Sequence, residues 1–544
     1  MERIIIVGSN KSSDIASKLN AQIIEVPNIY ENDFGVVNDF VIDKLNGDFD
    51  VVIIDIDRIE RPDLALSIGM YMRLSVFEIK ENALKPIIFT SDKLIKSFLH
   101  YKTFSQLLTT RNVYFQSRSN IITDAVQPID PKSYTDDFLD FINIRSEQGR
   151  HSLANQWGAS VIDKLVNKDK PSSIETIINA EKSLYFKFVN VQTIDVADYL
   201  SGKEALNGYV VQPVYAEGKH ILLIDDEADK GWEYVLKCMI KNAEAFQVIG
   251  HKMKDYQSLS KEEKDMIKKG NFDLIFLDLR MNGIEEDGIY KPEEFSGMKI
   301  LKQIKKVSPG TQVIMFTASN KAWNLKALLD AGADGYYIKE SPEYKFSFNF
   351  SKANYETLRE TIVKCLKRKY LRDADAIISK ITKDFNQTHV NKPFKDSIIN
   401  QLRMSYTLLS EEHFPYAYIS LYQVIEMINY EKLEMEDDGT WYIIDTNEDV
   451  KNWTITPFRK ECKDCKFTDE DKKKKFPEWK KIASLYYQLW KQSDKSFGYR
   501  IQQLIDDRNK LMHNDTNERK SPDLYNEKGY MKLLGDIALI CNFI

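Results

Sequence analysis

Four short apolar segments in the middle of the chain each end at a polar side chain that could take part in metal or phosphoryl chemistry. The segments with their end residues are Ile221–Ile224 before Asp225 and Asp226, Leu274–Leu277 before Asp278, Val313–Phe316 before Thr317, and Tyr336–Ile338 before Lys339. Segments of this kind are typical of buried strands in a parallel sheet, whose carboxyl ends share one ligand-binding edge. We therefore expect three carboxylates, a hydroxyl and an ammonium group to meet at one site.

This set of side chains suits a divalent cation together with a phosphoryl group. The carboxylates of Asp225, Asp226 and Asp278 are hard oxygen ligands, and Mg²⁺ commonly binds one or two carboxylates plus phosphate oxygens. Lys339 would neutralise phosphoryl oxygens, and Thr317 would donate a hydrogen bond to them. The alternative is a sheet edge that is merely acidic, which requires five positions on four strands to coincide by accident.

The segment from about residue 219 to residue 370 resembles the receiver domain of two-component response regulators. The resemblance implies that Asp278, in FLDLR, accepts a phosphoryl group from a cognate histidine kinase or another phosphodonor. It implies Mg²⁺ as the cofactor, with the ligands Asp225, Asp226, Asp278 and the backbone carbonyl of Arg280. It also implies a conformational switch that consists of Thr317, Tyr336 and Lys339.

Two features of this segment depart from the usual receiver pattern. The loop after the predicted phospho-acceptor is long, from Met281 to Ser296, and Glu340 follows Lys339 where receivers customarily have a proline. Neither departure removes a predicted chemical group.

Length, composition and charge set bounds on the protein class. A chain of 544 residues is long enough for three or four domains. The net charge of −6 decides neither for nor against a nucleic-acid partner. No apolar run approaches the roughly 18 residues that span a bilayer, the start MERIIIVGSN lacks a signal-peptide pattern, and five cysteines do not make a disulfide framework. These features predict a cytoplasmic protein without a membrane partner.

The first 120 residues repeat the strand pattern without its chemistry. DFDVVIIDID (48–57) matches NFDLIFLDLR (271–280) in residue type, and IIFTSD (87–92) matches IMFTAS in the same way. Gly8 and Ser9 stand where the receiver-like segment has its acidic pair, and Gln116 stands in place of the lysine. The pattern predicts a degenerate receiver-like domain that binds Mg²⁺ poorly. Phosphorylation of Asp55 is a minority alternative.

Residues 121–216 are predicted to form a helical linker region. Leu153, Trp157, Val161 and Leu165 recur at helical spacing, which indicates a core stripe or a helix that packs against its twin in a dimer. The receiver-like domain is assigned to residues 217–371, with a closing helix from Tyr355 to Leu371 after an aromatic loop at Tyr344–Phe350.

The C-terminal part, residues 372–544, reads as all-α with an insertion at residues 431–480. Helical periodicity covers Phe394–Ser410, Ala417–Tyr430, Ser496–His513 and Tyr530–Phe543. In the third of these helices, Ile501, Leu504, Ile505, Arg508 and Met512 share one side. Arg508 therefore lies in line with the apolar stripe, where an unpaired charge would be costly.

This helix resembles the third long helix of the HEPN superfamily, whose four-helix bundles carry an R-x(4–6)-H motif. The resemblance implies a metal-independent endoribonuclease whose active site forms across a homodimer, with an RNA substrate. Arg508 and His513 would be catalytic, Asn509 would assist them, and Glu426 in LYQVIEMIN would give weaker support. A histidine can exchange protons with the ribose 2′-OH and the leaving oxygen near neutral pH, and an arginine can hold phosphorane oxygens.

Other interpretations of the C-terminal part stay open. The helical domain could be a non-catalytic scaffold for dimerisation or partner binding, whereas a DNA-binding output lacks a basic recognition helix. Cys462 and Cys465 form one C-x-x-C pair, which is half of the four ligands of a structural zinc site. The predicted fold class is thus multidomain α/β plus all-α, with two flavodoxin-like (βα)5 domains, a helical linker region and a C-terminal helical bundle.

Overall fold

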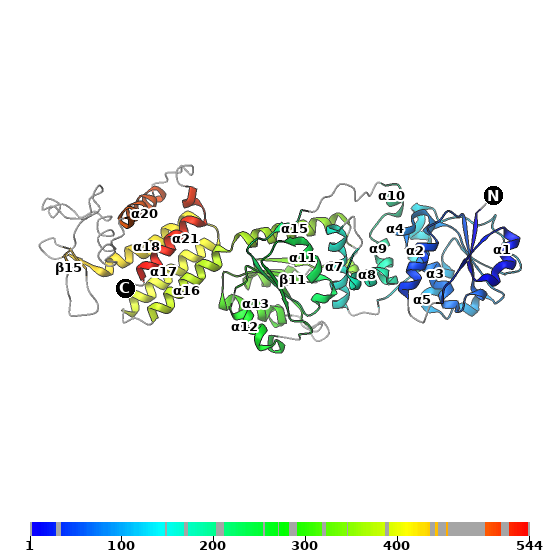
Figure 1. Ribbon diagram of the computed structural model, residues 1–544, viewed down its shortest axis with the longest axis horizontal. Helices are drawn as coiled ribbons and strands as arrows, with labels where there is room; N and C mark the ends of the chain where they lie inside the picture. Colours follow the sequence, from blue (N-terminus) through cyan, green and yellow to red (C-terminus); the bar gives the residue numbers. More distant parts are fainter. Residues whose placement is uncertain are drawn as a thin grey trace. The chain divides into compact units, whose positions relative to one another are not determined.

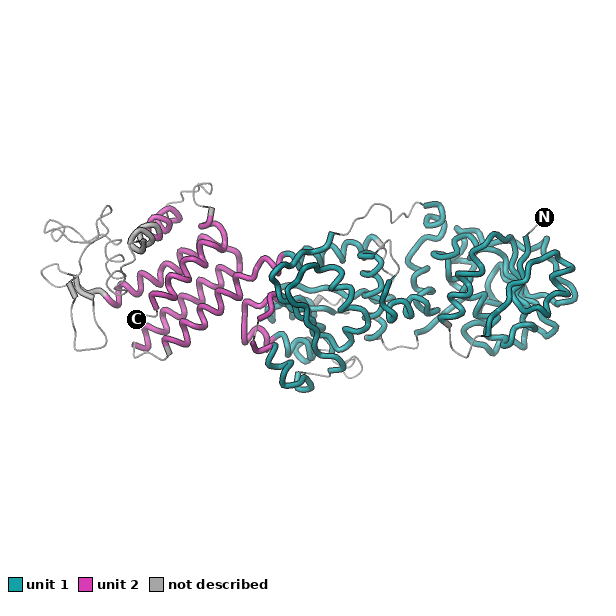
Figure 2. The backbone as a smooth tube through the Cα atoms, in the orientation of Figure 1, with its two compact units in different colours: residues 1–266, 274–301, 313–363 teal, residues 267–273, 302–312, 364–544 magenta. Residues whose placement is uncertain are grey.

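The structure, a computed structural model, describes residues 3–28, 34–146, 150–167, 172–202, 212–253, 256–269, 271–281, 291–317, 322–344, 346, 348–386, 391–435, 441–443, 453–454, 496–512 and 522–541. The chain divides into two compact units, teal and magenta in Figure 2. The first unit comprises residues 1–266, 274–301 and 313–363, and the second comprises residues 267–273, 302–312 and 364–544. None of the described helices is long and apolar enough to cross a membrane.

The N-terminal part of the first unit contains a five-stranded parallel sheet, blue in Figure 1. Its strands are β1 (Ile4–Gly8), β2 (Gln22–Glu25), β3 (Val51–Asp55), β4 (Ile87–Thr90) and β5 (Val113–Gln116). They lie in the order β2-β1-β3-β4-β5, with every neighbouring pair parallel, as in flavodoxin-like sheets. Alternate residues of β1 and β3 enter two different apolar clusters, so both faces of the sheet are covered.

The helices of this N-terminal part are short to medium in length. They are α1 (Ser13–Leu19), α2 (Phe34–Lys44), α3 (Pro62–Leu74), α4 (Val76–Ile79), α5 (Lys102–Ser105) and α6 (Tyr134–Asp137). The apolar runs of the sequence predict strands at Ile4–Val7, Val51–Ile54, Pro86–Phe89 and Val113–Phe115. These agree with β1, β3, β4 and β5 to within one residue at each end. β2 was not predicted, because its only apolar residues are Ile23 and Ile24.

Four helices follow in the region predicted to be a helical linker. They are α7 (Arg150–Val166), α8 (Glu175–Lys182), α9 (Leu184–Val191) and α10 (Val196–Leu200). Leu153 and Trp157 on α7 belong to the same apolar cluster as β3 and α3, and Leu165 is buried as well. The stripe predicted from its spacing is therefore core, and the region packs as part of the first unit.

A second five-stranded sheet, green in Figure 1, carries the predicted phosphoryl site. Its strands are β7 (His220–Ile224), β9 (Ala245–Ile249), β10 (Leu274–Asp278), β11 (Gln312–Thr317) and β12 (Gly335–Ile338). The order β9-β7-β10-β11-β12 repeats that of the first sheet, and the pairs β7–β9, β7–β10 and β11–β12 are parallel. The accompanying helices are α11 (Trp232–Met239), α12 (Lys261–Lys269), α13 (Ser296–Val307), α14 (Ala322–Asp330) and α15 (Phe348–Lys367).

The closing helix of this part differs from its prediction. α15 begins at Phe348 rather than Tyr355 and ends at Lys367 rather than Leu371. The predicted aromatic loop was wrong at its end, because Phe350 lies inside the helix and its ring stacks 4.1 Å from that of Phe346. Leu371 instead belongs to the next helix and enters the core of the second unit.

The second unit is a bundle of helices, yellow to red in Figure 1. Its described helices are α16 (Tyr370–Asn386), α17 (Lys392–Ser410), α18 (Phe414–Lys432), α20 (Ser496–Met512) and α21 (Glu527–Cys541). Three short antiparallel strands lie within the predicted insertion, namely β13 (Leu433–Met435), β14 (Trp441–Ile443) and β15 (Trp453–Thr454). Cys462 and Cys465 lie outside the described residues.

α16 is a helix that the sequence analysis did not predict. Its apolar residues recur at helical spacing and are buried in one cluster with α17, α18 and α21; they are Leu371, Ala374, Ile378, Ile381 and Phe385. The first of these residues was assigned to the preceding helix, and the rest of the segment is strongly polar. The described part of the bundle therefore contains one core helix beyond the four that were predicted.

Candidate phospho-acceptor site and C-terminal motif

Three carboxylates meet at the carboxyl edge of the second sheet. Asp225 follows β7 directly, Asp278 is the last residue of β10, and both are buried. Together with Asp226 they offer oxygen atoms that all lie within 4.8 Å of one another. The register of β7 on β10, with Ile224 opposite Leu277, brings the ends of the two strands level. The predicted meeting of the three carboxylates is thus present in the structure.

Lys339 supplies the cation at this edge. Its Nζ lies 3.0 Å from an oxygen of Asp225 and 3.1 Å from an oxygen of Asp278, and its side chain is almost fully buried. Burial alone would lower the pKa of Lys339, but the two carboxylates outweigh it and raise that pKa above its ordinary value. The ammonium group therefore stays charged and holds two carboxylates that would otherwise repel each other.

The two predicted switch residues occupy the neighbouring strand ends. Thr317 is the last residue of β11 and is buried, and its backbone carbonyl accepts a hydrogen bond of 2.7 Å from the amide of Lys339. Tyr336 is half-buried on β12, opposite Met315 of β11. Tyr337, the next residue, points into the core instead, where its ring packs against Trp232 and Phe316.

The three carboxylates fit a bound Mg²⁺ in their chemistry. Hard oxygen atoms from two strand ends surround one small volume, which is the donor set that Mg²⁺ favours. Arg280, whose backbone carbonyl was predicted as a further ligand, follows two residues after Asp278, and its guanidinium lies 5.0 Å from the centre of the Phe295 ring. The role of its carbonyl stays a prediction.

Two residues of this neighbourhood were missed by reasoning from sequence. Asn155 of α7 is buried and hydrogen-bonds both Lys339 and Glu227. Glu340 is also buried, and it accepts hydrogen bonds from Ser351 (2.5 Å) and Asn354 (3.2 Å) at the start of α15. Burial raises the pKa of Glu340 despite these two hydrogen bonds. No local sequence pattern around Asn155 indicates a role at this site. Glu340 was noticed only because it follows Lys339 where receivers customarily have a proline.

The corresponding edge of the first sheet has a different arrangement. Asp55, at the end of β3, is fully buried and accepts two hydrogen bonds of 3.0 Å from the guanidinium of Arg118. Ser12 donates a third bond of 2.8 Å to the same carboxylate. Gln116, which stands in the place of the lysine, bonds the backbone of Ile122 instead. Arg118, two residues beyond β5, is therefore the cation of this edge, and the sequence analysis did not identify it.

In the second unit, three of the four predicted catalytic residues lie together. Arg508 on α20 donates a hydrogen bond of 2.8 Å to Glu426 on α18 and one of 3.1 Å to the side-chain oxygen of Asn509. Its guanidinium also lies 5.6 Å from the centre of the Tyr422 ring. His513 lies outside the described residues. The predicted stripe was wrong at Met512, which is exposed because Leu511 occupies the buried side of the helix end.

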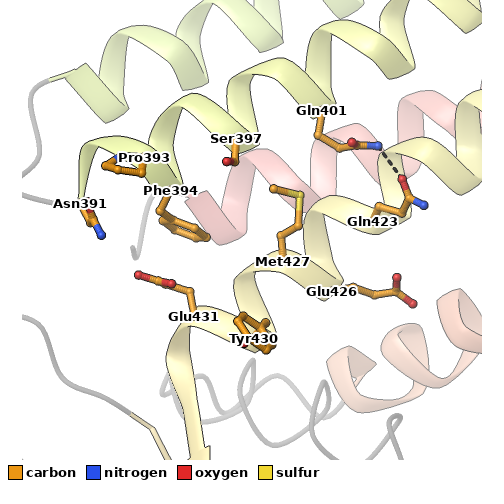
Figure 3. A pocket seen from close by; sticks show the side chains of 10 residues that line it. All are labelled: Asn391, Pro393, Phe394, Ser397, Gln401, Gln423, Glu426, Met427, Tyr430 and Glu431. Atoms are coloured by element: carbon orange, nitrogen blue, oxygen red, sulfur yellow. Dashed lines mark hydrogen bonds between the residues drawn. The ribbon is translucent and has the colours of Figure 1, made fainter.

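Glu426 also stands at the rim of a groove of about 570 Å³ between α17 and α18 (Figure 3). The groove is lined by amides, two aromatic rings and two carboxylates; its residues are Asn391, Pro393, Phe394, Ser397, Gln401, Gln423, Glu426, Met427, Tyr430 and Glu431. Gln401 donates a hydrogen bond of 2.7 Å to Gln423 across one end. The described lining holds no basic side chain.

Comparisons with known proteins bear on the second sheet. Residues 221–346 match the family model of the response regulator receiver domain, so this segment is a receiver domain. The nitrate/nitrite response regulator protein NarP of Escherichia coli (strain K12) is 34% identical over 77 residues, which are 14% of this chain and 31% of NarP. The chain thus spans less than a third of the length of this relative.

Two solved structures, both of proteins described as two-component system response regulator/GGDEF domain proteins, are also similar to this chain. Each is 12% identical to this chain in sequence. The matched region covers 66% of this chain and 99% of the chain in the solved structure, and the TM-scores are 0.16 and 0.17. At such low scores the likeness carries no argument about the rest of the chain. What the comparisons show is therefore confined to the receiver domain at residues 221–346.

Proposed function

We propose that the whole chain is a response regulator whose phospho-acceptor is Asp278. The observation that carries this proposal is the position of Lys339, which contacts both Asp225 and Asp278 at the carboxyl edge of the sheet. In the proposed reaction, the bond between phosphorus and the donor nitrogen or oxygen breaks, and a bond forms between phosphorus and a carboxylate oxygen of Asp278. Lys339 then donates to a phosphoryl oxygen and balances part of its charge.

The proposed Mg²⁺ ligands are Asp225, Asp226, Asp278 and the carbonyl of Arg280. When bound, the metal ion neutralises negative charge on the phosphoryl group and on the carboxylates around it. Thr317 and Tyr336 are the proposed switch residues, because a hydroxyl at the end of β11 can turn toward a phosphoryl group and leave space for the aromatic ring. The N-terminal sheet is proposed to be a degenerate receiver, since Arg118 already neutralises Asp55.

Phosphorylation by acetyl phosphate with Mg²⁺ tests this proposal. The wild-type chain should gain one phosphoryl group, detected by intact mass, and Asp278→Asn should gain none. Asp55→Asn is the matched control, since it removes the equivalent carboxylate of the other sheet and should leave phosphorylation intact. A phosphoryl group on Asp278→Asn would assign the chemistry to another residue.

We further propose that the second unit is a HEPN-like effector, a metal-independent endoribonuclease that acts as a homodimer. Arg508, His513 and Asn509 would form the active site, with Glu426 as a supporting residue. The contact of 2.8 Å between Arg508 and Glu426 supports this assignment, because it holds the guanidinium in a fixed position on α20. His513 would exchange protons with the ribose 2′-OH and the leaving oxygen, and Arg508 would hold the phosphorane.

RNA cleavage by the purified chain, with and without beryllofluoride, tests the effector. His513→Ala and Arg508→Ala should each lower the rate at least about 100-fold. The matched control is Lys510→Ala, which removes an exposed cation from the same helix and should leave the rate within about twofold. Cleavage that survives in His513→Ala would contradict the assignment.

The alternative function is a signalling scaffold in which the helical unit only dimerises or binds a partner. A specific observation favours it: Arg508 is already bonded by Glu426 and Asn509 and lies against Tyr422, which is what a structural arginine requires. In that case the wild-type chain cuts no RNA, and Glu426→Gln weakens the helical unit itself. Absence of cleavage together with that loss of stability would select the scaffold.

A further inference from the structure

A residue from outside the receiver domain reaches into its phospho-acceptor site. Asn155 lies on α7, well before the matched segment 221–346, yet only 1% of it is exposed. Its side-chain oxygen accepts a hydrogen bond of 2.5 Å from Nζ of Lys339, and its side-chain nitrogen donates one of 2.9 Å to Glu227. The amide group of Asn155 is thus hydrogen-bonded through both its oxygen and its nitrogen, to Lys339 and to the acidic loop after β7.

The interface between α7 and the receiver is closely packed. Asn155, Gly158 and Ala159 lie on one face of the helix, three and four residues apart. A Cβ on Gly158 would come within 2.9 Å of the Trp232 ring, and a Cβ on Gly231 would come within 2.8 Å of the Ala159 methyl group. Gly231 also has a φ of +125°, which a residue with a side chain rarely adopts. Small residues on both sides therefore allow the approach that places Asn155.

The ammonium group of Lys339 has three N–H donors, and three oxygen atoms lie close to it, two in hydrogen bonds and that of Asp278 in an ion pair. These are Asp225 at 3.0 Å, Asp278 at 3.1 Å and Asn155 at 2.5 Å. A phosphoryl group on Asp278 would add doubly charged acceptor oxygens beside the same ammonium. Charged acceptors form stronger hydrogen bonds than a neutral amide does, so the amide is the acceptor that loses its donor.

We propose that Asn155 is a positioning residue of the phospho-acceptor site, which holds Lys339 before phosphorylation and is displaced by the phosphoryl group. The proposal rests on the proposed phosphorylation of Asp278. A buried amide that loses its partner destabilises its surroundings, so α7 loosens from the receiver when the phosphoryl group forms. The packing of α7 on the receiver thereby depends on whether Asp278 is phosphorylated.

The helices next to α7 connect it to the N-terminal part of the chain. Lys182 on α8 pairs with Asp39 on α2 at 2.6 Å, and Lys187 on α9, which is 3% exposed, pairs with Glu78 on α4 at 2.5 Å. Trp157 on α7 belongs to the apolar core of the N-terminal sheet. A change at Asn155 is therefore transmitted to the N-terminal part, whose own acidic edge is locked by Arg118.

The test uses the full chain with Mg²⁺ and beryllofluoride as the phosphoryl mimic. Hydrogen exchange of the amides of α7 is measured, and bound beryllofluoride is titrated by ¹⁹F NMR. In the wild type, beryllofluoride should speed exchange in α7 several-fold. In Asn155→Ala, exchange should already be fast and should not respond. Coupling is reciprocal, so this variant should also bind beryllofluoride several-fold more tightly than the wild type.

The matched control is Asn167→Ala, which removes another amide that joins the end of α7 to α11, through Tyr234, away from the site. It should keep the wild-type response of α7 and the wild-type affinity. Tighter binding distinguishes displacement from structural damage, since damage would weaken the site. The inference about Asn155 is overturned if Asn155→Ala binds beryllofluoride no more tightly than the wild type, or if bound beryllofluoride does not change exchange in α7 of the wild type. Either result leaves the proposed phosphorylation of Asp278 in place. A wild type that neither binds beryllofluoride nor gains a phosphoryl group on Asp278 refutes the proposed function as well.

Discussion

At the scale of single residues, the two sheets solve the same electrostatic problem with different cations. A buried carboxylate at the end of a central strand needs a positive partner, because an isolated buried charge is costly. Asp278 shares the ammonium group of Lys339 with Asp225, whereas Asp55 is held in a bidentate contact by the planar guanidinium of Arg118. A lysine that can turn toward a ligand suits a reactive site, and a bidentate arginine suits a fixed one.

Replacing Lys339 by methionine tests the charge balance of the receiver site. The change removes the ammonium group that contacts the buried carboxylates of Asp225 and Asp278, so we expect it to lower the unfolding free energy of the first unit by about 3 kcal/mol in EDTA. Mg²⁺ should restore much of this loss, since a cation would again lie among the carboxylates. Urea unfolding with and without Mg²⁺ measures both values. Lys237→Met, which removes an exposed pair with Glu233, should cost under about 1 kcal/mol. An equal loss with and without Mg²⁺ would speak against a metal site.

Arg118→Ala makes the corresponding test in the N-terminal sheet. It removes the guanidinium from the buried carboxylate of Asp55, to which the hydroxyl of Ser12 still donates, and we expect a loss of about 3 to 4 kcal/mol. Mg²⁺ should not restore it, because the acidic residues that the structure describes around Asp55 do not form a group of three metal-ligating side chains. The control is Arg111→Ala, which removes an exposed guanidinium from Asp137; since Ser133 still donates to that carboxylate, the change should cost under about 1 kcal/mol. Rescue of Arg118→Ala by Mg²⁺ would reopen the case for a second metal site.

At the scale of elements, strands were predicted more accurately than helix ends. The strands that bear the site are continuous apolar runs, which are typical of sheets covered on both faces. α16 was hidden because its apolar residues are separated by charged ones and its first buried residue, Leu371, extends the pattern of the helix before it. Helix boundaries near a short connection depend on which core the side chains enter, and local periodicity does not contain that information.

α16 also carries Asp375, a carboxyl group whose partial burial lowers the stability of the folded state when it is ionised. Burial raises the pKa of Asp375 from 3.8 to about 6. Since the folded state disfavours the ionised form, this residue lowers stability above pH 6, and the cost fades as the pH falls toward 4. The group is only half-buried, so we expect Asp375→Asn to raise the unfolding free energy of the second unit by about 1 kcal/mol at pH 7.5 and by much less at pH 4.

Urea unfolding at the two pH values, followed by circular dichroism, measures this effect. Asp396→Asn removes an exposed carboxylate from α17 and should change the unfolding free energy by less than about 0.5 kcal/mol at either pH. If the gain from Asp375→Asn were the same at both pH values, ionisation of the carboxyl group would not be its cause.

At the scale of the whole molecule, most of the receiver segment belongs to the first compact unit and the helical bundle belongs to the second. A regulator of this design needs a change in the receiver to alter the association or activity of the other unit. We therefore expect beryllofluoride to shift the monomer–dimer equilibrium of the wild-type chain, because the proposed switch residues, Thr317 and Tyr336, would change position when a phosphoryl group forms. Sedimentation velocity at several protein concentrations measures the shift. Asp278→Asn should show no response, and a wild type whose dissociation constant is unchanged by beryllofluoride would contradict this coupling.

The sequence by itself determined the receiver domain and the polar residues that meet at its carboxyl edge, because parallel strands bring their carboxyl ends to one edge and so convert positions along the chain into neighbours. Asp225, Asp278, Thr317 and Lys339 were all identifiable in this way. Only the tertiary structure decided which residues from elsewhere reach that edge. Asn155 arrives on a helix far upstream, and Arg118 approaches Asp55 from beyond the last strand. Such contacts depend on how helices pack against a sheet, and a local pattern of residue types does not record that packing.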